Sequence, residues 1–577
     1  MRGRAPSCAE YEWHVAQEDR PQTEALARTL EVPRVVAHLL IHRGIDSVER
    51  ARRFLSPGLE YVGPPDSLAD MDRAVERIRR ARDDGERVLV FGDYDVDGIA
   101  GTALLLRALR RFGLTPCRAG MPNRLEEGYG LNPKHVREAH EQGVGLIITV
   151  DNGTTAHESC AVARALGIDV IVTDHHQIKD NPPDVFAFIN PKRQDPSHPS
   201  ADACGAAVAF KLAWALTGEA ADIDLAALGT VADIVPLCGE NRDLVAAGIA
   251  QISERPLVGL VKLGETAGTR MDELTAEHIA FQLAPRINAG GRMGDGARTG
   301  LELLLTDDPD EATRLARALD EANQQRREVE NTIYRQALQA LSGPAGQATA
   351  FHPDQRTVVL ACRAWHPGVV GIVASRLQSV YYRPTVLIAV DDDGCGRGSA
   401  RSVDGFDITH ALFECREHLV KVGGHANAAG LTIDSAKVGA FREAFEAEAR
   451  KHLPEGELRR RLDIDAQVAF TEVDGRLISG MDLLRPFGFG NEAPVLCTFG
   501  AAVVPGSCRE LRGGHLRATL KDGAKIMAAI GFHMGDRLAE LEHAGTVDVA
   551  FSPQFNTWRG ETTIQLVLKD IRPARSA

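Results

Sequence analysis

Three aspartates, each separated from the next by one residue, follow an apolar segment in the stretch Arg87 to Thr102, RVLVFGDYDVDGIAGT. The apolar run 88–91 predicts a strand buried on both faces, and Asp93, Asp95 and Asp97 come directly after it. Open α/β sheets bind their ligands at the carboxyl ends of the strands. Three carboxylates this close raise one another's pKa unless a cation neutralises them. A divalent metal is the simplest explanation; an acidic turn that only caps the next helix is the alternative.

More carboxylate and imidazole side chains follow in the same region. Asp151 lies in VDNGT, the adjacent pair His175 and His176 in VTDHH, and Asp233 in GTVADIVPL. A lone aspartate after a strand usually caps a helix, but side chains at the ends of separate strands of one sheet can converge. Mixed aspartate and histidine ligation suits manganese or magnesium better than metals that prefer thiolates. Together with the first triplet, these residues predict a divalent-metal site.

Two later stretches have the composition of phosphate-binding segments. Arg286, Arg292 and Arg298 fall within thirteen residues of a stretch that we expect to be loop-like, and each guanidinium could pair bidentately with phosphate. The segments 396–402 (GRGSARS) and 423–425 (GGH) are rich in small residues, which let a backbone approach phosphate closely. Solvated surface arginines and ordinary glycine-rich turns are the alternatives.

Alternating apolar strands and helices must position these side chains. This alternation predicts βαβ units and a parallel sheet. The expected strands are 88–91, 145–150, 169–173 and 186–189, and the expected helices are 70–83, 103–112, 133–142, 155–166, 205–216 and 224–234.

The rest of the chain divides into further domains. Residues 307–341 are helical and too polar for a core helix, so we expect them to bridge two domains. A second α/β pattern follows at 357–449, and short strands separated by turns predict a small β-barrel after residue 461. We therefore predict an α/β multidomain protein with an N-terminal helical region, a parallel-sheet domain, a bridging helix, a second α/β domain and a barrel: 1–70, 71–306, 307–345, 346–453 and 454–577.

Composition limits the possible functions. A chain of 577 residues is too long for one core. Its net charge of −14 argues against a protein that grips nucleic acid through overall charge, but permits a local basic groove. Ten cysteines form no CxxC pair, so neither a zinc site nor a disulfide framework is expected, and free thiols suit a reducing cytoplasm. We expect no signal peptide and no membrane contact.

The acidic motifs also resemble a known family. GDYDVDG, VDNGT, DHH and GTVADIVPL, in this order, are similar to the motifs of the DHH phosphoesterase superfamily. PRINAGGRM and GGHANAAGL resemble its RecJ branch and the DHHA1 domain of that branch, and PFGFGNEAPVL resembles the segment that opens the RecJ oligonucleotide-binding (OB) fold. The resemblance implies a DHH domain, a bridging helix, a DHHA1 domain and an OB-type barrel. It also implies a processive 5′→3′ exonuclease for single-stranded DNA, which releases 5′-mononucleotides in DNA repair and recombination.

The resemblance implies two divalent cations, Mn²⁺ or Mg²⁺. Asp93 and Asp95 would each hold one ion, Asp151 would bridge the two, and His175 and Asp233 would complete the coordination of the second ion. Two such ions activate a water and stabilise the transition state of phosphodiester hydrolysis.

Two neighbours of these ligands have different expected roles. His176 would face the substrate phosphate rather than a metal. Related members carry a metal-ligating histidine four residues before the first aspartate, where this chain has Leu89. The first site therefore has one side-chain ligand fewer, for which water or Asp97 could compensate.

The resemblance further implies a set of substrate-binding residues and partners. Besides single-stranded DNA, the expected partners are a single-strand-binding protein and a helicase, and the expected state is a monomer. The predicted substrate-binding residues are His176, Arg286, Asn288, Arg292, Ser375, Arg376, Arg401, Ser402 and His425; a surface position on a helix is the alternative for Arg376.

Two other functions compete with this one. A DHH phosphodiesterase for short oligonucleotides would be shorter and would lack the barrel, so residues 461–577 argue against it. A non-enzymatic DNA-binding scaffold would be expected to have lost its metal ligands, whereas this chain keeps all five predicted ones.

Overall fold

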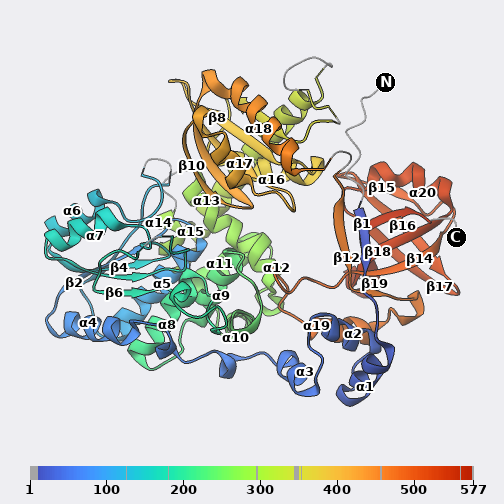
Figure 1. Ribbon diagram of the computed structural model, residues 1–577. Helices are drawn as coiled ribbons and strands as arrows, with labels where there is room; N and C mark the ends of the chain where they lie inside the picture. Colours follow the sequence, from blue (N-terminus) through green and yellow to red (C-terminus); the bar gives the residue numbers. More distant parts are fainter. Residues whose placement is uncertain are drawn as a thin grey trace.

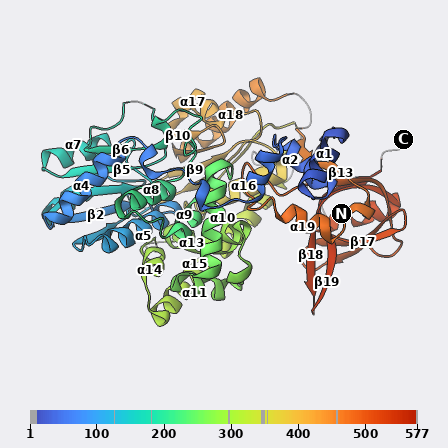
Figure 2. The same cartoon turned by 90° about the horizontal axis from the view of Figure 1, so that it is seen from below.

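The computed structural model has three sheet-containing bodies, and the N-terminal strand and the C-terminal strands lie together on one side (Figure 1; Figure 2 gives a second view). The predicted α/β multidomain class is confirmed by these sheets. The structure describes residues 11–124, 127–179, 181–293, 297–343, 350–352, 354–454, 458–558 and 560–574.

The first domain is built on a parallel sheet of five strands in the order β3-β2-β4-β5-β6. Its central strands are buried on both faces, as their apolar sequences predict. The chain leaves β2 for β3 on one side and returns to β4 on the other, so the strand order reverses between β2 and β4. Ligands bind at such a point. The strands are β2 (Arg87–Gly92), β3 (Cys117–Gly120), β4 (Val144–Val150), β5 (Asp169–Thr173) and β6 (Ala187–Ile189).

Helices cover both faces of this sheet and extend the domain beyond it (Figure 1). They are α4 (Met71–Asp83), α5 (Val96–Arg111), α6 (Pro133–Glu141), α7 (His157–Ala165), α8 (Gly205–Thr217), α9 (Ile223–Ala232), α10 (Gly239–Glu254), α11 (Val258–Ala267), α12 (Ala276–His278), α13 (Ala284–Met293) and α14 (Ala297–Leu305).

Helix α5 begins seven residues earlier than predicted, inside the acidic motif. Gly98 and Gly101 have low helix propensity and hid this start in the sequence. Gly98 is needed because a Cβ there would lie 2.6 Å from the backbone nitrogen of Asp93. The early start places Asp95 at the N-cap and Asp97 in the first helical turn.

The stretch around Arg286 and Arg292 was predicted to be a loop, and this prediction is wrong. It forms α13, and Arg298 lies on α14. A π-helical turn, Ile279–Leu283, precedes α13. Gly291 is tolerated because its missing Cβ lets α13 approach the carbonyl oxygen of Tyr94.

The long helix α15 (Pro309–Leu341) contributes to two cores. Leu315 and Leu319 pack in the core of the first domain, whereas Ile333 and Leu341 pack in that of the second α/β domain. The second domain has a mixed sheet in the order β10-β11-β9-β8-β7. Its elements are β7 (Val358–Cys362), α16 (Val370–Tyr381), β8 (Thr385–Val390), β9 (Cys395–Arg401), α17 (Ile408–Glu414), β10 (Leu419–His425), β11 (Ala428–Asp434) and α18 (Val438–His452).

The C-terminal strands close into a ring, because β14 pairs with both β16 and β18. The ring also includes β17 and β19. The elements are β12 (Arg460–Ile464), β13 (Ala466–Gln467), α19 (Gly475–Asp482), β14 (Leu496–Val503), β15 (Arg509–Leu511), β16 (His515–Asp522), β17 (Lys525–Gly531), α20 (Leu538–Ala544), β18 (Thr546–Trp558) and β19 (Glu561–Pro573).

The N-terminal region is not a separate body. Leu39 and Leu40 share a core with Leu516 and Phe551 of the ring, and β1 pairs with β12. Within the described residues, no single helix is long and apolar enough to cross a membrane, although the bent pair α10 and α11 meets the length and composition criteria together. The N-terminal elements are β1 (Tyr11–Val15), α1 (Arg20–Leu30), α2 (Arg34–His42) and α3 (Val48–Leu55).

Candidate metal centre

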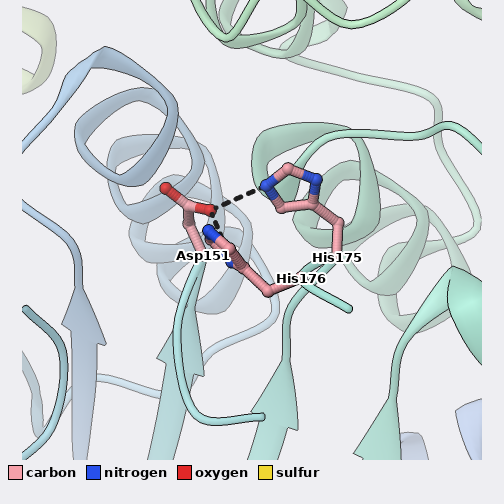
Figure 3. Close-up of side chains that lie close together, drawn as sticks. All are labelled: Asp151, His175 and His176. Atoms are coloured by element: carbon pink, nitrogen blue, oxygen red, sulfur yellow. Dashed lines mark ion pairs between the residues drawn. The ribbon is translucent and has the colours of Figure 1, made fainter. Parts of the chain in front are cut away.

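Asp151 lies at the middle of the predicted site, directly after β4 (Figure 3). Its backbone adopts φ +60°, which turns the chain out of the strand. Its Oδ1 is 3.1 Å from Nε2 of His175 and 3.8 Å from Nδ1 of His176. Gly205 makes room for this carboxylate, because a Cβ there would lie 2.5 Å from Cβ of Asp151.

Asp93 and Asp95 approach Asp151 from the neighbouring strand. Gly92 is paired with Val150 in the sheet, so the residues that follow the two strands are neighbours. Asp95 Oδ1 also accepts the backbone N–H groups of Asp97 and Gly98. The helix cap, which was the alternative to a metal site, is therefore present. Asp95 forms this cap and also belongs to the acidic cluster.

Asp97 is anchored more firmly than the sequence indicated. Its two carboxylate oxygens accept the N–H groups of Gly205 and Ala206 at 2.7 and 2.8 Å, at the start of α8. Its Oδ2 is 3.8 Å from His175 Nε2. The N-terminus of a helix stabilises a carboxylate in this position.

Asp233 completes the cluster from the end of α9. Its Oδ2 lies 3.6 Å from His175 Nε2. The next residue, Ile234, has φ +60° and is 69% exposed. A β-branched residue in this conformation is strained, and such strain commonly accompanies functional sites.

These side chains form three groups, each of which could hold a metal ion, and the groups share Asp151 or His175. In each, one ligand atom per residue lies within 4.8 Å of the others. Asp97 belongs with His175, so it becomes a candidate ligand in addition to the five predicted. The groups are Asp93, Asp95 and Asp151; Asp97, His175 and Asp233; and Asp151, His175 and His176.

Unpaired buried atoms show that divalent cations fit this site. Asp93 Oδ1, Asp151 Oδ1 and His175 Nε2 are buried and have no hydrogen-bond partner among the described residues. A buried polar atom without a partner is costly. A cation that takes oxygen and imidazole ligands would satisfy all three atoms.

The pKa values point the same way. Burial, with the charge of Asp95, raises the pKa of Asp93 well above its usual range, and burial, with the charge of Asp97, does the same for Asp151. Burial, Asp97 and Asp95 raise the pKa of Asp233 to about 9. Burial lowers the pKa of His175, which leaves its imidazole neutral and able to ligate.

His176 has different partners from His175. Its Nδ1 lies 2.8 Å from Asp174 Oδ1 and 3.0 Å from the hydroxyl of Tyr129. Burial alone would lower the pKa of His176, but the hydrogen bond to Asp174 and the charge of that carboxylate raise it to about 9. His176 is therefore a cation at neutral pH, suited to a phosphate.

These pKa shifts predict how the metal-free protein responds to pH. Between about pH 6.5 and about pH 9, folded Asp233 and His176 hold protons that the unfolded chain has lost. The stability of the metal-free protein therefore falls as pH rises through this window. We expect its melting temperature in EDTA to fall from about pH 6.5 to about pH 8.5 and saturating Mn²⁺ to remove the decline. A flat curve in EDTA would contradict this.

Leu89 contributes nothing polar to the first group. Its side chain is 3% exposed and packs with Phe91 and Leu131 on the other side of β2 from the α5 core. No side chain of β2 therefore replaces the histidine that related members carry.

Two arginines lie near the acidic cluster, since the charges of Asp95 and Arg401 both act on Arg292. Arg292 donates to the carbonyl of Gly368, and Arg401 donates to Ser375 Oγ, Ser399 Oγ and its neighbouring carbonyl. Within the described part of the chain, neither forms an ion pair. Burial and the nearby charge of Arg124 lower the pKa of Arg292 to about 10, and burial lowers that of Arg401. Such half-buried cations create a strong attraction for phosphate.

Several predicted substrate residues have other contacts. Arg286 donates to Asp320 at 2.9 Å and to the carbonyl of Gln282, and Arg298 forms an exposed pair with Glu302. The pair with Asp320 joins α13 to α15, whereas Arg298 and Glu302 both lie on α14.

The remaining predicted substrate-binding residues lie on different elements of the structure. Asn288 accepts the N–H of Val96, which ties α13 to the acidic motif. Ser402 donates to the carbonyl of Phe406, whereas the side chain of His425 is exposed at the end of β10. Arg376 contacts Asn331 and covers the ring of Tyr334, as expected for the surface alternative.

Three further residues at the site were not predicted from the sequence. Arg124 lies over the ring of Tyr94 at 4.7 Å, and the hydroxyl of Tyr129 donates to the carbonyl of Asp151 at 2.8 Å. Tyr94 stands between Asp93 and Asp95, and the other two lie in the polar segment between β3 and α6. The sequence signal that could have identified them was their residue type, because aromatic and basic side chains are typical of surfaces that bind single-stranded nucleic acid.

Known proteins resemble each domain of this chain. Family models match residues 87–236 (DHH family, N-terminal domain), 354–451 (DHHA1 domain) and 464–570 (RecJ OB domain). The single-stranded-DNA-specific exonuclease RecJ of Bacillus subtilis is 34% identical over 97% of this chain and 70% of its own length. The Escherichia coli protein of the same name is 34% identical over 94% of this chain and 96% of its own length.

Solved structures agree with these matches. The RecJ of Thermus thermophilus in complex with Mn²⁺ superposes with a TM-score of 0.83 at 32% identity, covering 98% of this chain and 80% of that one. The same protein in complex with Mg²⁺ gives a TM-score of 0.77 at 30% identity, covering 98% and 79%.

Proposed function

Because the chain belongs to the RecJ family of single-stranded-DNA-specific exonucleases, we propose that it hydrolyses single-stranded DNA processively from the 5′ end and releases 5′-mononucleotides. The observation that carries the proposal is that the candidate metal ligands occur together with two arginines that form no ion pair among the described residues. The ligands are Asp93, Asp95, Asp151, His175 and Asp233, and the arginines are Arg292 and Arg401. The cluster fits two divalent ions, Mn²⁺ or Mg²⁺, which occur in the related structures.

The ligand residues divide between the two ions as the groups do. The resemblance implied one ion each for Asp93 and Asp95, but the grouping favours a different division: Asp93 and Asp95 would hold one ion together, and His175, Asp233 and Asp97 the other, with Asp151 near both. Two bound ions supply an activated water and neutralise charge that develops on the phosphate. The water oxygen bonds to phosphorus and the 3′ oxygen of the terminal nucleotide leaves, so the phosphate stays on the next nucleotide.

The other side chains hold the substrate. His176, protonated through Asp174, would bind the scissile phosphate, and Tyr129 keeps its imidazole in place. Arg292 and Arg401 would bind phosphates from α13 and β9. Ser375 orients Arg401, since its hydroxyl accepts from Nε at 3.0 Å. Ser402, His425 and Asn288 stay as proposed contacts, whereas the contacts of Arg286 and Arg376 favour structural roles.

End-labelled DNA tests the proposal. With Mn²⁺, we expect 5′-labelled single strands to release labelled mononucleotide at once, and 3′-labelled strands only at the end of digestion. Duplex DNA should resist. Equal digestion of duplex, or activity confined to dinucleotides, would refute the proposal in favour of a phosphodiesterase for short oligonucleotides. The match to a RecJ OB domain argues against that alternative.

A substitution of Arg401 tests the phosphate contact. For Arg401→Ala we expect KM for single-stranded DNA to rise about 10- to 100-fold, because a hydrogen bond to a charged group contributes about 1.5–3 kcal/mol. The slope of log KM against log salt concentration should fall by the amount that about one phosphate contact contributes. Arg401→Lys should recover the salt slope but only part of the KM, since lysine lacks the guanidinium fork. A change in thermal stability alone would make Arg401 structural.

Further proposals rest on family membership. We propose the domain bounds 71–306, 307–345, 346–453 and 454–577 for the DHH domain, the bridging helix, the DHHA1 domain and the OB domain; the three matched regions fall inside them. Likewise, we propose a monomer in the cytoplasm that works in DNA repair and recombination with a single-strand-binding protein and a helicase.

A further inference from the structure

Phe281 is the most exposed aromatic side chain among the described residues, at 73%. Burial of a phenylalanine is favourable, so a ring left in solvent is informative where a binding surface is nearby. It lies in the π-helical turn Ile279–Leu283, whose end residues are both buried. Turns of this kind are frequent at functional sites.

The helix that carries Phe281 connects the C-terminal domain with the metal centre. At one end, Glu277 forms an ion pair with Arg485 at 2.9 Å, just before the ring of strands. At the other end, Asn288 bonds to Val96 of the acidic motif. Figure 1 shows α12 on the side of the first domain that faces the C-terminal strands, and α13 farther from those strands.

One face of this helix stays accessible along its length. Phe281, Pro285, Asn288 and Arg292 follow one another at spacings of four, three and four residues, which places them on a common face. All four are exposed or half-buried, whereas the residues of the opposite face, such as Leu283 and Ile287, are buried. The exposed ring and the unpaired arginine therefore share a surface that leads to the metal centre.

We propose that Phe281 stacks against a base of the single strand as it runs from the OB domain to the metal centre. The inference rests on the proposed exonuclease function. The occupant is a nucleobase because the same face presents Arg292 to phosphate, and aromatic stacking accepts any base. Eleven residues of helix separate the two side chains by about 16 Å, which corresponds to roughly five stacked nucleotides at 3.4 Å each.

The distance leads to a test by substrate length. For Phe281→Ala, KM for a long single strand should rise about 5- to 100-fold with kcat nearly unchanged, since stacking contributes about 1–3 kcal/mol per base. A 5′-phosphorylated trinucleotide is too short to reach the ring, so its inhibition constant should not change. Phe281→Tyr should restore KM. Phe413→Ala, which removes an exposed phenylalanine from α17 (44% exposed), is the matched control.

Three results would overturn the inference. They are an unchanged KM on long strands, an equal loss of affinity for the trinucleotide, and the same loss in Phe413→Ala. A wild-type protein that digests no single strand would instead refute the proposed function. Photocrosslinking adds a direct readout: 5-iododeoxyuridine placed about five nucleotides from the 5′ end should label the peptide 279–283, and Phe281→Ala should abolish this label.

Discussion

Asp151→Asn is expected to lower the exonuclease rate by about 10³-fold or more, because metal ions in such sites contribute several kcal/mol to the transition state. Asp151 is the residue common to the Asp93 group and the His176 group. An amide of nearly the same shape keeps one oxygen but removes the negative charge. Asparagine also tolerates the backbone conformation at φ +60°, which alanine would strain.

The same substitution should not unfold the protein. The pKa of Asp151 is raised well above its usual range by burial and by Asp97, so the charged carboxylate destabilises the metal-free fold. We expect metal-free Asp151→Asn to melt at or slightly above the wild-type temperature, and to lose most of the stabilisation that Mn²⁺ gives the wild type. Melting curves with EDTA and with Mn²⁺ measure both effects.

The neighbouring residue Asn152 is not a suitable place for a control substitution such as Asn152→Asp, because its side-chain amide donates hydrogen bonds to backbone carbonyls at the ends of β2 and β4. A better control is Asp195→Asn, which changes an exposed aspartate of the same domain whose side chain, among the described residues, accepts hydrogen bonds from Ser197 alone. Its activity and its response to Mn²⁺ should match the wild type. If Asp151→Asn instead melted far below the wild type without metal, Asp151 would be a structural residue.

The candidate metal ligands could be picked out from the sequence because each follows a strand or a helix whose apolar sequence is clear. Asp97 was harder to assign, since its role depends on α8, whose N-terminal N–H groups come from residues about 108 positions away in the chain. The side-chain spacing of GDYDVDG alone cannot reveal such a partner. The resemblance to a known family identified the second domain as a DHHA1 domain and the C-terminal strands as an OB fold. Periodicity alone predicted a second α/β pattern and a small β-barrel.

The misassigned stretch around Arg292 has a different cause. Gly290, Gly291 and Pro285 favour a loop in isolation, but tertiary contacts decide. Gly291 allows α13 to pass close to Tyr94, and the exposed Phe281 lies in the π-turn before it. Likewise, Leu39 and Phe551 are more than 500 residues apart in sequence, so no local pattern could show that they share a core.

Arg242→Met should destabilise the protein more than the substitutions at Asp151, Phe281 and Arg401. Arg242 is 2% exposed and donates to the carbonyl oxygens of Phe54, Leu484 and Arg485 at 2.7, 3.3 and 2.6 Å. It thereby joins the N-terminal region, the first domain and the segment that leads into the ring. Methionine would fill much of the volume but remove the donor from the carbonyls of Phe54 and Arg485, whereas the carbonyl of Leu484 would keep its hydrogen bond from Asn491. Since hydrogen bonds to charged groups contribute about 1.5–3 kcal/mol each, we expect a loss of about 3 kcal/mol or more.

The consequence for function should depend on the substrate. A loosened junction leaves the metal ligands in place but frees the OB domain from the helix that carries Phe281, so KM for long strands should rise while a trinucleotide binds as before. Arg52→Met, an exposed arginine on α3, is the matched control and should stay within about 0.5 kcal/mol of the wild type. Urea unfolding gives the stability, and limited proteolysis should cut Arg242→Met first near residues 484–491. Equal stability of the two variants would mean that Arg242 does not hold the junction together, and that the OB domain is positioned by the backbone contact between Leu237 and Phe489 instead.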